Sequence, residues 1–242
     1  NDIKTEFLVL GYYRQLLKFT LSEITVGADT VQRSQSARNL GVILDQNMSM
    51  DKQVSSVVKS VNWQLYNINK IRKYLTNESC QTLVNAFVTS RIDCNNAILA
   101  GIPGYQLKRL QLLQNTAARI ISCKSRYDHI TPLLKSLHWL PVEYRIKYKL
   151  SLMVFKCLHG LAPSYLSELL NKKQTCKYSL RSAATCDNML EIPKTKRNMG
   201  DKAFSVAGPR AWNQLPHHLR TEDNLDTFKK KLKTCYFRIA YA

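Results

Sequence analysis

Residues 51–75 read DKQVSSVVKSVNWQLYNINKIRKYL, and this stretch decides how the rest of the chain is interpreted. Its apolar side chains recur at the spacing of helix turns, at Val54, Val57, Val58, Val61, Leu65 and Ile68. On a helix they form one stripe about 100° wide, which is typical of a helix with one face in a core. The stretch therefore predicts one long amphipathic helix.

The opposite face of this helix carries cations interleaved with aromatic rings. Its members are Lys52, Lys59, Trp63, Tyr66 and Lys70. The spacing from residue 59 to residue 70 places four of them within about 60° of arc. Ammonium groups contact phosphates and flat rings pack on sugars or exposed bases, so this face favours nucleic-acid binding. The alternative is a helix sandwiched in the protein, with Trp63 and Tyr66 packed against a neighbour and the lysines solvated.

Upstream of residue 51 the sequence favours strands rather than helices. Glu6–Gly11 and Leu40–Asp45 are rich in β-forming residues. Glu23–Val26 and Thr30–Arg33 flank a short turn at residues 27–29, which is typical of a hairpin. The predicted fold class is α+β, in which a short antiparallel β segment precedes a mainly helical chain.

Downstream of residue 75 the chain is predicted to be mostly helical. We expect helices near Thr76–Ile92, Tyr105–Cys123, Pro141–His159 and Leu225–Tyr236. A short helix is expected to begin at Thr131 and Pro132, and another short helix is expected after Pro163. Ala203–Val206 favours a short strand, and Pro209–Pro216 favours a helical turn. Residues 171–200 suggest a linker or an exposed basic arm. The expected regions are 1–50, 51–124 and 125–242.

The helix after Pro141 has a basic edge as well as an apolar face. Its apolar face comprises Val142, Ile146, Leu150, Met153 and Val154. Three cations fall within about 40° of one another at its edge, namely Arg145, Lys149 and Lys156. Such an edge can follow a phosphate backbone. The alternative is a solvated helix edge without a ligand.

The positive charge is concentrated in part of the chain. The formal net charge is +19, from 36 Lys and Arg against 17 Asp and Glu, and residues 1–50 hold five of each sign. The whole excess therefore falls in residues 51–242, where self-repulsion is relieved best by a polyanion. Nucleic acid is the expected partner. An anionic membrane surface is the weaker alternative, and because no apolar run is long enough for a membrane span, we expect no membrane partner.

Motifs of catalysis and metal binding are missing from the sequence. The seven cysteines include no C-x-x-C pair, which indicates reduced thiols and an intracellular protein, nuclear or cytoplasmic. No nucleophile motif or phosphate-binding glycine loop occurs, and the carboxylates are scattered. We therefore predict no catalytic residue, metal ligand or cofactor, and we expect structural roles for His129 and His138.

Ten ordered strings across nearly the whole chain resemble one protein family. They lie at residues 4–8, 39–45, 90–93, 110–119, 128–134, 137–146, 161–166, 180–182, 209–216 and 228–233. The chain is similar to the C-terminal part of the reverse transcriptase of non-LTR (LINE-like, jockey-related) retrotransposons. The resemblance implies a hand-shaped polymerase, in which residues 1–50 end the palm, residues 51–124 form the thumb, and residues 125–242 form a basic, mostly helical C-terminal region.

The resemblance also implies roles for individual residues and partners. Lys4 would lie near the incoming nucleotide, and Leu40, Gly41 and Val42 would support the primer end at the palm–thumb junction. The implied partners are a template–primer duplex of RNA and DNA and the upstream palm and fingers. The family's catalytic aspartates would precede Asn1, so Mg²⁺ is expected only for a complete polymerase.

The sequence leaves three functions open. The first is a nucleic-acid-binding fragment that does not polymerise alone. The second is part of an active reverse transcriptase, completed by an upstream catalytic half. The third is a host-retained fragment whose basic helices bind an acidic protein. One departure from the family is that Asp93 and Cys94 are adjacent, where the family often has an aromatic residue between them.

Overall fold

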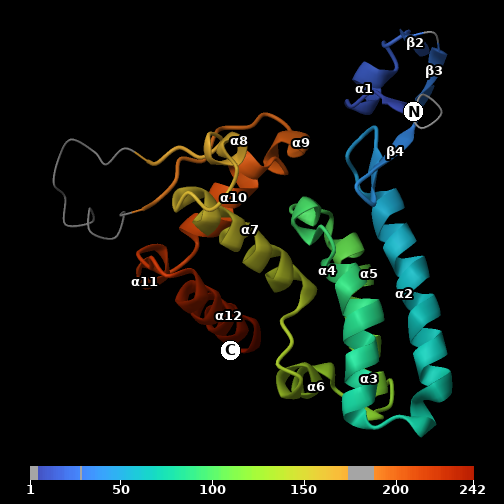
Figure 1. Ribbon diagram of the computed structural model, residues 1–242, viewed down its shortest axis with the longest axis vertical. Coiled ribbons are helices and arrows are strands. Elements are labelled where there is room, and N and C mark those ends of the chain that lie inside the picture. The colour runs from blue at the N-terminus through green and yellow to red at the C-terminus, as the bar shows by residue number, and fades with distance from the viewer. Residues whose placement is uncertain (1–4, 28, 174–187) are drawn as a thin grey trace.

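The fold is a mixed α+β architecture, as the sequence predicts (Figure 1). The computed structural model describes residues 5–27, 29–173 and 188–242. Short strands come first along the chain, and the later elements are mostly helices. Figure 1 shows two groups of helices side by side, one around α2 and α5 and the other around α7, α10 and α12, with the strands above the first group.

The N-terminal segment forms two small sheets and one short helix. Its elements are β1 (Phe7–Leu8), α1 (Tyr13–Leu16), β2 (Glu23–Val26), β3 (Asp29–Ser34), β4 (Ser36–Asn39) and β5 (Val42–Asp45). The β2–β3 hairpin is confirmed, with Val26 opposite Asp29. β1 pairs with β3 in parallel, whereas antiparallel strands were expected. β4, which pairs antiparallel with β5, was not predicted, because its polar residues give no alternating apolar signal.

The first group of helices contains the long helix that the sequence predicts. Its elements are α2 (Asp51–Ile71), η2 (Arg72–Tyr74), α3 (Asn77–Val84), η3 (Asn85–Thr89), α4 (Ser90–Asp93), η4 (Asn96–Leu99) and α5 (Gly104–Ser122). Val54, Val61 and Leu65 of α2 are buried, as the apolar stripe requires. Thr76 caps α3 as expected, because its Oγ1 accepts a hydrogen bond from the backbone N–H of Ser79, 3.1 Å away.

The second group of helices is built on α7. Its elements and their neighbours are α6 (Ile130–Ser136), α7 (Val142–Leu158), α8 (Ser164–Ser167), α9 (Asn198–Asp201), α10 (Phe204–Asn213), α11 (His217–Arg220) and α12 (Leu225–Tyr241). Two α5 glutamines hold the start of α7. Gln114 Nε2 donates to the carbonyl oxygen of Leu140 at 2.9 Å, and Gln111 Oε1 accepts from the N–H of Val142 at 2.8 Å.

The predicted strand at Ala203–Val206 is wrong, because Phe204–Val206 open helix α10. Packing against α7 decides this. Gly208 is buried, and a Cβ at Gly208 would lie 3.0 Å from Val154 Cγ2, so the missing side chain lets α10 approach α7 closely. A short apolar run fits either a strand or a helix until its tertiary contacts are known. The expected linker at residues 171–200 lies partly outside the described residues.

Helix α7 belongs to two hydrophobic cores. Val142, Ile146 and Leu150 pack in the first core with α2, α3 and α5. Val154 and Phe155, further along the same helix, pack in the second core with α10 and α12. Residues beyond 124 thus complete the core of the first group, and the boundary between residues 124 and 125 stays a prediction.

Two general expectations concern thiols and membranes. Cys80, Cys94, Cys123, Cys157 and Cys235 are free thiols, and Cys176 and Cys186 lie outside the described residues. None of the helices in the described ranges combines the length and the apolar character that crossing a bilayer requires.

Candidate nucleic-acid interface

The basic and aromatic face of α2 is open to solvent. We call Lys52, Lys59, Trp63, Tyr66 and Lys70 the α2 stripe. All five are exposed, and Trp63 and Tyr66 keep 63% and 58% of their surface accessible. The structure therefore contradicts the sandwiched alternative, in which both rings pack against a neighbour. Large exposed aromatic rings can mark a binding surface, because burying their apolar area against a ligand would be favourable.

The opposite side of α2 explains this exposure. Its apolar stripe packs against α5 and β5 and supplies much of the first core. A helix that is buried on one side only presents its other side to solvent along its whole length. Figure 1 shows α2 at the outer edge of the molecule, with α5 between it and α7.

Cations and rings contact each other along the α2 stripe. Lys70 Nζ lies 4.6 Å from the centre of the Tyr66 ring. Lys73 Nζ lies 4.8 Å from the centre of the exposed Tyr74 ring, which extends the pattern into η2. Cation–ring pairs of this kind are stable in water by only about 0.5–1 kcal/mol. They therefore leave both partners available for a nucleic-acid ligand.

Among the cation–ring pairs that were not predicted, two involve an exposed tyrosine and the cation directly before it in the chain. Lys73 and Tyr74 lie just outside the arc of the α2 stripe. Arg126 and Tyr127 lie on another part of the chain, where the guanidinium is 4.7 Å from the centre of an exposed ring. The signal was present in the sequence, since a cation directly precedes a tyrosine in both pairs.

The start of the α2 stripe is tied to the strands. Lys52 Nζ donates to Ser36 Oγ of β4 at 2.9 Å. The residues predicted to support a primer lie nearby in the chain, at the β4–β5 turn. Leu40 is exposed and has a φ of 46°, Gly41 has a φ of 82°, and Val42 is buried. Lys4, predicted to lie near a nucleotide, is outside the described residues.

The basic edge of α7 does not extend the α2 stripe, since α4 and α5 lie between the two helices (Figure 1). Its three cations also differ in their surroundings. Arg145 points into the protein, where Nη1 lies 2.6 Å from Asp93 Oδ2 and Nε donates to the Leu140 carbonyl at 2.9 Å. Lys149 is exposed, and Lys156 is half-buried. Arg145 is thus a structural ion-pair partner, and Lys149 remains the accessible cation of the edge.

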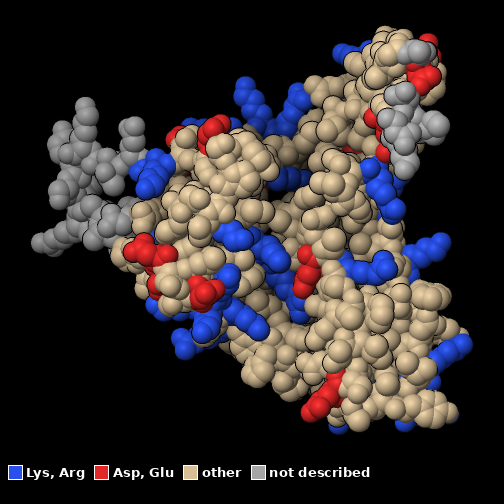
Figure 2. All heavy atoms as spheres, in the orientation of Figure 1, with Lys and Arg blue, Asp and Glu red and all other residues tan. Residues whose placement is uncertain are grey.

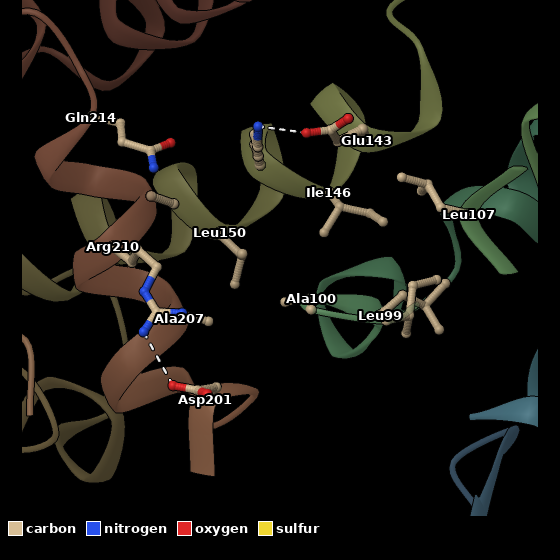
Figure 3. A pocket seen from close by; sticks show the side chains of 14 residues that line it. Leu99, Ala100, Leu107, Glu143, Ile146, Leu150, Asp201, Ala207, Arg210 and Gln214 are labelled. Atoms are coloured by element: carbon tan, nitrogen blue, oxygen red, sulfur yellow. Dashed lines mark hydrogen bonds and ion pairs between the residues drawn. The ribbon is translucent and has the colours of Figure 1, made fainter. Parts of the chain in front are cut away.

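A cavity of about 280 Å³ lies between α7, α10 and η4 (Figure 3). Its floor is apolar, with Leu99, Ile146 and Leu150 pointing inward. Two ion pairs lie at its rim. Lys147 Nζ is 2.7 Å from Glu143, and Arg210 Nη2 is 3.1 Å from Asp201.

The charged groups of this cavity are already paired with one another. Hydrogen bonds from Thr195 and then Arg210 lower the pKa of Asp201, so this carboxylate stays ionised. Among the described residues, no Ser, Cys or His side chain lines the cavity. This part of the structure therefore places no hydroxyl, thiol or imidazole side chain beside a base.

Within the described ranges, no group of three or more His, Cys, Asp and Glu side chains is placed to hold a metal ion. Comparison of the chain with protein-family models, with curated proteins and with solved structures gives no match. The assignment of a function therefore depends on the geometry described above and on the sequence strings.

Proposed function

We propose that this chain is a nucleic-acid-binding part of a non-LTR retrotransposon reverse transcriptase, and that it holds a template–primer duplex through the α2 stripe. The observation that carries the proposal is the solvent exposure of Trp63 and Tyr66 between Lys59 and Lys70. The ten family-like strings and the excess of positive charge after residue 50 support it.

The dimensions of the α2 stripe suit a duplex backbone. From Lys52 to Lys70 the helix rises roughly 27 Å, at 1.5 Å per residue. Lys52, Lys59 and Lys70 are roughly 10 and 16 Å apart along the helix axis, so they would meet phosphates that are several nucleotides apart. Each such contact would release condensed counterions. The rings add contacts to sugars or unpaired bases that do not depend on sequence.

The chain is proposed to bind and not to polymerise alone. The family's catalytic aspartates, and with them the Mg²⁺ of a complete polymerase, are assigned to an upstream palm and fingers. The β4–β5 turn, with Leu40 exposed at its tip, is the proposed support for the primer end. We also propose an intracellular location, nuclear or cytoplasmic, in agreement with the free thiols of the described cysteines.

A binding assay over a range of salt concentrations tests the proposal. The full chain is titrated into fluorescently labelled RNA–DNA duplex, and anisotropy gives the Kd. Lys59→Glu with Lys70→Glu should weaken binding, and the slope of log Kd against log salt should become flatter by about two units, because two phosphate contacts are lost.

The matched control replaces two exposed lysines elsewhere, Lys194→Glu with Lys230→Glu, which changes the net charge by the same amount. This control should reduce affinity less than the α2 variant does, and most of the slope of log Kd against log salt should remain. Equal effects of the two double variants would mean that overall charge, and not the α2 stripe, causes binding. Association with an acidic protein that persists after nuclease treatment, without duplex binding, would favour the protein-interaction alternative.

A further inference from the structure

A second cavity, of about 310 Å³, lies where α7 and α12 face the α4–η4 segment. Figure 2 shows Lys and Arg side chains gathered in the hollow between the α7–α12 side of the molecule and the α2–α5 side. The cavity is lined by Asp93, Trp139, Arg145, Tyr148, Lys149 and Lys233, among others. It shares no residue with the α2 stripe.

The charges around this cavity do not balance. Asp93 is the lining carboxylate, and Arg145 neutralises it at 2.6 Å. Lys149 of α7 and Lys233 of α12 remain, and neither makes an ion pair with any described residue. Two ammonium groups from different helices thus face one space. An anion between them would reduce their mutual repulsion.

One wall of the cavity is fixed before any ligand binds. Arg145 is held by Asp93 and by the Leu140 carbonyl, and its guanidinium lies 5.8 Å from the centre of the Trp139 ring. Buried Asn96 donates from Nδ2 to Asp93 Oδ1 at 3.2 Å and so fixes the carboxylate from the other side. Preorganisation of this kind lowers the entropy cost of binding.

The size of the cavity and the side chains that line it indicate a ligand larger than a bare anion. The cavity volume falls at the lower end of the range for small-molecule sites, about 300–1,000 Å³. That is more room than a phosphate group needs. The half-buried ring of Tyr148 offers an aromatic surface beside the two lysines, whereas Trp139 and Leu140 are buried and contribute only a small exposed area to the wall. An aromatic surface of this kind suits a sugar or a base.

We propose that this cavity binds a nucleoside 5′-monophosphate unit, with the phosphate between Lys149 and Lys233 and the nucleoside against Tyr148 and the small exposed part of Trp139. The unit is either a free nucleotide or the 5′-phosphorylated end of a strand. This site goes beyond the proposed duplex-binding function, because it is built from α7 and α12 and not from α2.

Calorimetric titration of the full chain tests the site with a nucleoside 5′-monophosphate, the same nucleoside without phosphate, and inorganic phosphate. A short oligonucleotide with and without a 5′-phosphate provides the second pair of probes. We expect one bound equivalent of the nucleoside 5′-monophosphate and at least tenfold weaker binding of the nucleoside. The oligonucleotide pair is compared in the chain that carries Lys59→Gln and Lys70→Gln, because the α2 stripe is expected to bind a strand with or without its 5′-phosphate, and there the strand without the phosphate should bind more weakly. Tight binding of the strand end alone identifies it as the source of the phosphate.

Two double variants separate this proposal from the duplex-binding function. Lys149→Gln with Lys233→Gln should weaken binding of the phosphorylated probe at least tenfold. Lys59→Gln with Lys70→Gln should leave binding of the nucleoside 5′-monophosphate unchanged while reducing duplex affinity. All four lysines are exposed, so circular dichroism should show an unchanged fold.

Three results would overturn the cavity proposal. The first is equal binding of the phosphorylated probe by the chain with and without the Lys149 and Lys233 substitutions. The second is inorganic phosphate binding as tightly as the nucleotide. The third is the lack of heat from every phosphorylated probe.

Discussion

The side-chain hydroxyl groups of Ser151 and Tyr236 lie 2.9 Å apart in the buried interface between α7 and α12. Both residues are almost inaccessible to solvent. Each hydroxyl has the other as a partner there, so the hydrogen bond fixes how the two helices face each other. This interface also determines the separation of Lys149 and Lys233, because those lysines project from the same two helices.

Alkaline pH should destabilise this interface. Burial raises the pKa of Tyr236 to about 12, against 10.0 for a free tyrosine. The raised pKa means that the folded chain holds the proton more tightly than the unfolded chain. Its contribution is fully present below about pH 10 and is lost as the pH rises towards about 12. The loss should approach about 3 kcal/mol, measured as the free energy of unfolding in urea at increasing pH.

Tyr236→Phe is the control for this pH dependence. It should cost about 1 kcal/mol at neutral pH through the lost hydrogen bond to Ser151, and it should flatten the decline above pH 10. Burial also raises the pKa of Tyr241 to about 12, so some decline should remain in the variant. Identical alkaline slopes for the two proteins would show that Tyr236 is not the group responsible.

Gly208→Ala should destabilise the chain by about 1–3 kcal/mol, the usual cost of overpacking. The added Cβ would lie 3.0 Å from Val154 Cγ2 and 3.1 Å from Phe204 Cε2, so these side chains, or α10 with them, would have to shift by a few tenths of an ångström. Gly104→Ala is the matched control, because a Cβ there meets no atom within 4 Å. Thermal unfolding measures both. A Gly208 variant as stable as the Gly104 variant would disprove the close packing of α10 on α7.

Arg72 should be among the polar residues most important for stability. Its Nε and Nη2 donate to the carbonyl oxygens of Ile120 and Ile121, each at 2.8 Å, and its Nη1 donates to Leu75 at 2.7 Å. The side chain thus joins the end of α2 to the last turn of α5, where carbonyls otherwise lack partners. Arg72→Ala should cost about 3 kcal/mol, and Arg72→Lys should restore only part of it.

The comparison for Arg72 is Lys73→Ala, which removes an exposed cation from the next position. Chemical denaturation should show almost no effect of that change, because exposed side chains contribute about 0.5 kcal/mol or less. A Lys73 variant as unstable as the Arg72 variant would assign the effect to charge and not to the carbonyl contacts.

Trp63→Ala with Tyr66→Ala should weaken binding of single-stranded RNA or DNA by about 1–3 kcal/mol for each base that stacks. The salt dependence should stay the same, since no cation is removed. Stability should also stay the same, because both rings are exposed. The control is Tyr165→Ala, another exposed aromatic, on α8. Anisotropy titrations at two salt concentrations measure the effect, and loss of affinity in the control alone would count against the α2 stripe.

The sequence predicted the parts of the fold that depend on local periodicity. The valine stripe of α2 has a period that only a helix satisfies, and the β2–β3 hairpin has a short glycine-containing turn. β4 was not predicted, because its state depends on pairing with β5. The first turn of α10 was wrongly predicted as a strand, because its state depends on contact with α7. Local patterns carry no information about such partners.

The candidate sites could also be predicted from the sequence only in part. The order of cations and rings on α2 was visible in the sequence, but their exposure was not, because a helix can be covered on either face. The approach of Lys233 to Lys149 could not be predicted at all, since it depends on how α12 packs on α7. The assignments of palm, thumb and primer support stay predictions.

The continuity of α7 through both cores has a mechanical consequence. Bending α7 where one core passes into the other would separate buried side chains that now pack together, which costs packing energy. The distance between the two groups of helices should therefore change little. A strand bound to the outer surface of α2 and a nucleotide bound near α12 would therefore stay at a nearly constant distance from each other.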